Sequence, residues 1–95
     1  IYTTAKPKKQ IAFSKVWNEC TNTSSVTLSA EKLDCAANDK IEWSVVCSTG
    51  SEKGNVSDTG VYTPASSAKT GDLIAVKAHL KSDSSVYSIA LISIT

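Results

Sequence analysis

The twelve residues GNVSDTGVYTPA, positions 54 to 65, decide the fold class of this chain. The Asp-Thr-Gly sequence that ends at Gly60 predicts a tight reversal, because glycine adopts backbone conformations that other residues resist. Residues 61 to 63 are long enough only for a short edge strand. Pro64 ends that strand, since proline cannot donate to a sheet ladder. A short strand between turns is typical of an antiparallel β-protein.

Three segments before this stretch carry the period-two alternation of half-buried strands: residues 10 to 17, 25 to 30 and 40 to 48. In the third segment, four residues are predicted to face the core: Ile41, Trp43, Val45 and Cys47. Residues 30 to 38 are predicted to form a loop. A tryptophan on the apolar face of such a strand is typical of a core residue rather than a ligand platform.

The segments after the stretch are the most apolar of the chain. In residues 72 to 82 the pattern predicts His79 outward, and four side chains inward: Ile74, Val76, Ala78 and Leu80. The closing segment, from residue 87, is apolar on both faces. Its row Tyr87, Ile89 and Leu91 is therefore a candidate interface. The alternative is a central strand that its neighbours leave only partly exposed.

Short strands at this spacing predict an all-β antiparallel sandwich or barrel, and a sandwich of about seven strands fits the length best. Residues 10 to 95 are expected to form this single domain, and residues 1 to 9, with their lysine cluster and Pro7, are expected to form a linker.

The charge pattern excludes several partners. Ten lysines oppose nine acidic residues and the chain has no arginine, so specific recognition of nucleic acid is not expected. The sequence also has no apolar run long enough for direct membrane insertion.

The residue types that carry catalysis are sparse. His79 is the single histidine, no serine or cysteine precedes or follows it in a recognisable catalytic order, and the cysteine spacings fit no zinc pattern. We therefore expect no enzyme activity, no catalytic residues, no cofactor and no metal.

The three cysteines permit one disulfide. If residues 10 to 17, 25 to 30 and 40 to 48 are consecutive antiparallel strands, Cys20 and Cys47 emerge at the same pole, and a Cys20–Cys47 bridge is predicted. Cys35 would then be a free thiol. The alternative is that all three cysteines are reduced and buried.

The order of these features resembles that of the bacterial immunoglobulin-like domains found in surface proteins, adhesins and secreted enzymes. The resemblance rests on Trp43, on the segment from Gly60 through Tyr62 to Pro64, and on the two closing strands, and it covers residues 40 to 95. The family writes Y-T-A-P-A where this chain has the shorter Y-T-P-A, which affects the local turn.

The resemblance implies an immunoglobulin-like Greek-key β-sandwich. It also implies that this domain is a non-catalytic spacer, stalk or adhesion module of an extracellular or cell-surface protein. Its partners would be neighbouring domains of the same chain, and possible further partners are a host receptor or surface protein. Two alternatives stay open: a domain that binds a receptor or glycan through its loops, and a decoration domain of a phage or virion. Fold class alone does not separate these tasks.

Overall fold

The computed structural model describes residues 9–35, 38–50 and 52–95. These residues form strands and no helix, which confirms the all-β prediction. The predicted linker, residues 1 to 9, lies outside the described residues except for Lys9. The strands are β1 (Gln10–Phe13), β2 (Trp17–Cys20), β3 (Val26–Thr27), β4 (Ala30–Leu33), β5 (Ile41–Ser48), β6 (Asn55–Val56), β7 (Val61–Thr63), β8 (Leu73–Leu80) and β9 (Tyr87–Ile94).

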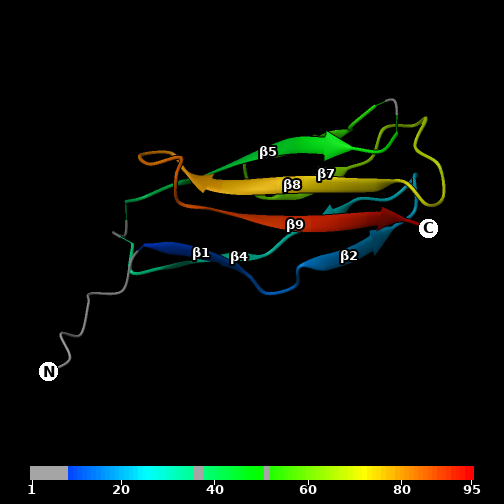
Figure 1. Ribbon diagram of the computed structural model, residues 1–95. Helices are drawn as coiled ribbons and strands as arrows, with labels where there is room; N and C mark the ends of the chain where they lie inside the picture. The colour runs from blue at the N-terminus through cyan, green and yellow to red at the C-terminus, as the bar shows by residue number, and fades with distance from the viewer. Residues whose placement is uncertain (1–8, 36–37, 51) are drawn as a thin grey trace, which may run out of the picture.

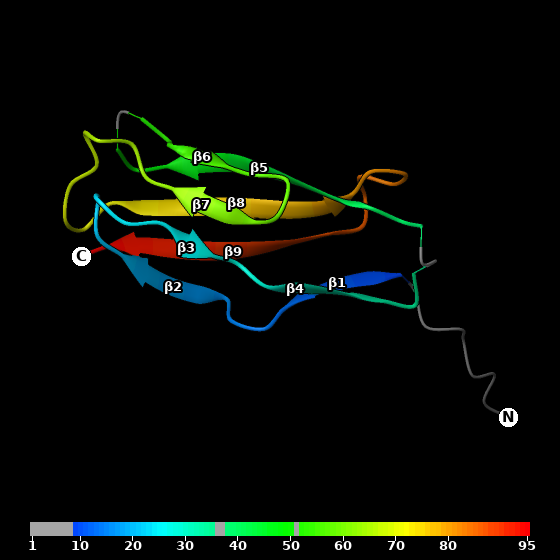
Figure 2. The same cartoon turned by 180° about the vertical axis from the view of Figure 1, so that it is seen from behind.

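The strands form a four-stranded sheet of order β2-β9-β8-β5, a three-stranded sheet of order β3-β7-β6, and the pair β1-β4. Strands β2 and β9 are parallel, and the other pairs are antiparallel. The three-stranded sheet lies over one face of the four-stranded sheet (Figures 1 and 2). The arrangement of the described strands is sandwich-like.

The first predicted strand, residues 10 to 17, is divided between two sheets. Strand β1 pairs with β4, and after a short break β2 pairs with β9. The main-chain N–H of Leu91 bonds to the carbonyl of Val16 (2.7 Å) and holds the chain at the break. The predicted loop at residues 30 to 38 is wrong in its first part, because Ala30–Leu33 completes the ladder with β1.

The core lies between the layers and follows the predicted alternation of β8. Ile74, Val76, Ala78 and Leu80 are all fully buried. On β9 the buried row is Ala90, Ile92 and Ile94, and the facing layer contributes Leu28 and Tyr62. Burial of this apolar surface is the main stabilising term in the fold.

The stretch at residues 54 to 65 forms the predicted reversal. The N–H of Gly60 donates to the carbonyl of Ser57 (3.0 Å), and Gly60 has a positive φ of 86°. The prediction that residues 61 to 63 form an edge strand is wrong. Strand β7 lies between β3 and β6, so Pro64 ends a central strand and is itself buried.

Strand β5 contains a β-bulge that changes its inward row. The register with β8 shifts between Val45 and Cys47, so one extra residue, Val46, interrupts the alternation. Ile41, Trp43 and Val45 face the core and are partly buried, as predicted. Cys47, predicted to face inward, is opposite Ala75 on the outer face and is exposed.

Candidate interaction surface

The outer face of the four-stranded sheet carries most of the exposed apolar side chains of the described chain. The row Tyr87, Ile89 and Leu91 points outward from β9, which is a central strand between β2 and β8, as the alternative expected. Tyr87 is 54% exposed, whereas Ile89 and Leu91 are only partly exposed, at 36% and 38%. Trp17 on β2 lies opposite Leu91 and is 46% exposed. We call these four residues the outer apolar face.

Cross-strand register places the residues of this face in rows. Trp17, Leu91, Ala75 and Cys47 form one row across the sheet. The next row contains Ile89 opposite Lys77, and the third contains Tyr87 opposite His79. Because such pairs are in direct contact across a sheet, the apolar residues form a continuous strip along β9 that leads to Trp17.

Charged side chains border the strip. The Lys77 ammonium lies 4.6 Å from the centroid of the Tyr87 ring, close enough for a cation–π attraction. His79 Nε2 is 3.1 Å from Glu42 Oε1 on β5. His79 is thus outward, as predicted, but partly buried, and its Nδ1 has no hydrogen-bond partner among the described residues. The pair fixes the ring against the sheet.

A buried polar residue holds the edge strand of this sheet in position. Asn18 is 6% exposed, and its Nδ2 donates to the carbonyls of Lys15 (3.1 Å) and Leu91 (3.4 Å). Buried amide groups are stable only when bonded in this way. Asn18 therefore aligns β2 with β9 and turns Trp17 outward.

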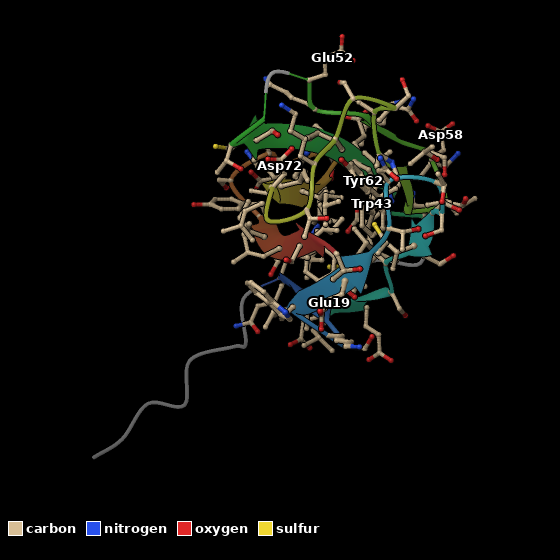
Figure 3. The ribbon with its side chains drawn as sticks, turned by 90° about the vertical axis from the view of Figure 1, so that its right-hand side faces the viewer. Glu19, Trp43, Glu52, Asp58, Tyr62 and Asp72 are labelled. Carbon is tan, nitrogen blue, oxygen red and sulfur yellow. The ribbon has the colours of Figure 1, made fainter. Side chains whose placement is uncertain are left out.

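The residues predicted as the fold signature lie between the layers. Figure 3 shows Trp43 and Tyr62 inside the molecule. Trp43 packs edge-on against Phe13, with ring centroids 5.8 Å apart, and its ring lies against Gly60. The Tyr62 hydroxyl donates to the carbonyl of Lys53 (2.7 Å), and burial raises the pKa of Tyr62 to about 12. These residues are structural.

The predicted Cys20–Cys47 disulfide is not formed, and all three cysteines are free thiols. Both cysteines end their strands at the same pole, but β2 and β5 are the opposite edges of one sheet. Three interstrand spacings of about 4.8 Å separate them, more than the roughly 7 Å that a disulfide spans. Cys20 also faces the core, where burial raises its pKa, whereas Cys47 faces outward.

The acidic side chains are dispersed. Figure 3 shows Glu19, Glu52 and Asp58 at separate positions on the periphery, and the described residues contain no group of three metal-ligating side chains. Within the described chain no helix is long and apolar enough to cross a membrane. The comparisons with known proteins add no relative: no protein family matches the chain, and no curated protein matches it.

The sequence left two readings of Trp17 open, as a residue that closes the core or as one that packs against a preceding domain, and it did not indicate the exposure of Val46. The predicted strand of residues 10 to 17 ends at Trp17, whereas in the structure Trp17 and Glu19 alternate with the buried Asn18 and Cys20 as a separate strand. Val46 is exposed through the bulge, for which the sequence of β5 contains no signal.

Proposed function

We propose that the chain is a non-catalytic immunoglobulin-like module that acts as a spacer in an extracellular or cell-surface protein. Strand order supports the fold assignment. When β3 and β4 are taken as one interrupted strand, the layers read β1-β4/β3-β7-β6 and β2-β9-β8-β5. This order matches the two sheets of an immunoglobulin-like Greek key, with the first strand shared between them.

The observation that carries the spacer role is the position of the chain ends. Strand β1 begins at one pole of the sandwich, and β9 ends at the opposite pole (Figure 1). Strands β1 and β2 together run the length of the domain, about 11 residues, which corresponds to roughly 35 Å at 3.3 Å per residue. Each copy in a tandem array would therefore add its full length to the array.

A binding role is the second candidate, and the outer apolar face favours it. Trp17 and Tyr87 are large, exposed aromatic residues on one sheet face, and aromatic residues are enriched at the centres of protein interfaces. A neighbouring domain of the same protein or a host surface protein would fit this face. The loops at the poles, where the alternative glycan-binding role would reside, contribute none of these aromatics.

Small-angle scattering on one, two and three fused copies of the full chain tests the spacer proposal. We expect the maximum dimension to increase by at least about 35 Å with each copy. The matched control is the same series carrying Trp17→Ser and Leu91→Ser, which removes apolar contact area without changing where the chain enters and leaves. A maximum dimension that stays constant in both series would refute the spacer role. If only the control series extends, the unsubstituted copies fold back on one another through the outer apolar face, which would favour the binding role.

A further inference from the structure

The edge of the four-stranded sheet at β5 has hydrogen-bonding groups that no described strand uses. Among the described strands, β5 pairs only with β8. The N–H of Lys81 donates to the carbonyl of Lys40 (2.8 Å), so even-numbered residues at this end of β5 bond to β8. In an antiparallel ladder the intervening residues direct both main-chain groups the other way. Ile41, Trp43 and Val45 therefore present their N–H and C=O groups at the edge.

This edge differs from the others in the described chain. The edge strand at the other side of the sheet, β2, has four residues, and both edges of the three-stranded sheet, β3 and β6, have two. Short strands such as these are poor templates for pairing. Strand β5 has eight residues with no lysine or proline among them. Its bulge at Val46 ends the regular edge, which leaves residues 41 to 45 suited to pairing.

Space for another strand lies beside this segment. An open groove borders the first part of this segment, at Ile41, Glu42 and Trp43. Its other lining residues are Lys32, Asp39, Lys40, Asp58, Thr59, His79 and Lys81. An extended chain in this groove would meet the outward main-chain groups of β5. Strand addition of this kind is a known mode of recognition, in which the main-chain hydrogen bonds supply the affinity.

We propose that this edge pairs with the β5 edge of a second copy of the chain, antiparallel and about a two-fold axis at Trp43. In this register Ile41 lies opposite Val45 of the second copy, and Trp43 lies opposite its own counterpart. Three such pairs form about six hydrogen bonds, because each pair exchanges two. The contact is self-complementary, as a two-fold interface requires, and it joins the two sheets into one.

The charges of β5 are compatible with a second copy and select the register. Glu42 lies opposite Ser44 of the second copy, so no like charges meet. A shift of two residues in one direction would place Glu42 opposite its own counterpart, which destabilises a sheet pair. A shift in the other direction would bring the bulge at Val46 into the ladder, where it disrupts pairing. Because the two copies run antiparallel, the entry pole of one lies beside the exit pole of the other.

Site-specific cross-linking tests the register. In a Cys35→Ser, Cys47→Ser background, one chain carries Glu42→Cys and another carries Ser44→Cys. Positions 42 and 44 form non-hydrogen-bonded pairs in the proposed ladder, with Cα atoms about 4.5 Å apart, within disulfide range. Mixed chains should form a disulfide-linked dimer under mild oxidation, and each chain alone should not. Chains carrying Ser66→Cys and Thr70→Cys, both exposed on a loop, measure random collision. Cross-linking at or below this control overturns the proposal.

Charge substitutions at Ser44 separate dimerisation from folding. Ser44 is opposite Lys77 within the chain and opposite Glu42 across the proposed interface. Ser44→Glu should therefore stabilise the monomer but weaken the dimer about tenfold, and Ser44→Lys should do the reverse. Sedimentation equilibrium measures the dimer, and urea unfolding at concentrations where the chain is monomeric measures the fold. Dimer affinity that is unchanged, or that follows monomer stability, overturns the proposal.

Discussion

Replacement of Gly60 by alanine is expected to be among the most destabilising single-methyl changes in this chain. Gly60 has a φ of +86°, and a Cβ at this position would lie 2.8 Å from the carbonyl oxygen of Leu28 and 2.8 Å from the ring of Trp43. The Leu28 carbonyl is main chain, and the Trp43 ring is packed between the layers. Neither neighbour can move without disturbing the core.

The magnitude has two parts. A left-handed backbone costs alanine about 1 kcal/mol relative to glycine. Forcing a methyl group into a packed site costs about 1–3 kcal/mol more. We therefore expect Gly60→Ala to lower the free energy of unfolding by about 3 kcal/mol, which corresponds to a decrease in Tm of roughly 12–24 °C for a domain of this size.

Gly71 provides the matched control. Its φ is +96°, but a Cβ built there has no neighbour within 4 Å, so Gly71→Ala carries the backbone cost alone, about 1 kcal/mol. Urea unfolding of both variants, followed by tryptophan fluorescence, measures the difference. Equal losses in the two variants would show that the contact of Gly60 with Trp43 and Leu28 does not limit stability, and would refute the packing argument.

Three further results are expected from buried groups. The free energy of unfolding should fall as pH rises from about 10 to about 12, because the unfolded chain releases the Tyr62 proton at a lower pH than the folded chain. Tyr62→Phe should flatten this part of a curve of stability against pH. An unchanged curve would show that other groups cause the pH dependence. Asn18→Asp replaces two donated hydrogen bonds by a carboxylate facing two carbonyls, so urea unfolding should show a loss of about 2–3 kcal/mol, whereas a neutral effect would mean that water reaches the site. In the native protein a thiol reagent should label exposed Cys47 rapidly and buried Cys20 only after denaturation; equal labelling rates would contradict the burial of Cys20.

The sequence predicted the parts of the fold that depend on one strand at a time. The alternation in β8 identified the buried row that includes Val76, and the alternation in β9 separated the row Tyr87, Ile89 and Leu91 from the row that is buried. This worked because side-chain direction in a strand follows a period of two, whatever strand lies beside it.

Features that depend on pairing between distant strands were not predictable. The bulge at Val46 is a shift in the register between β5 and β8. Because of this shift, Cys47 faces away from the core. Likewise, β2 separates from β1 because Trp17–Cys20 finds a parallel partner in β9. The disulfide prediction failed for the same reason, since it assumed that neighbours in sequence are neighbours in the sheet. The resemblance to bacterial immunoglobulin-like domains stays a prediction.

The parallel pairing of β2 with β9 has a mechanical consequence. A force that stretches the described chain pulls β2 toward the pole where β1 begins and β9 toward the opposite pole (Figures 1 and 2). The ladder from Trp17–Leu91 to Cys20–Ile94 is then loaded in shear, along the strands, so its hydrogen bonds bear the tension together instead of opening one after another. A domain connected in this way would extend little under load and then yield abruptly.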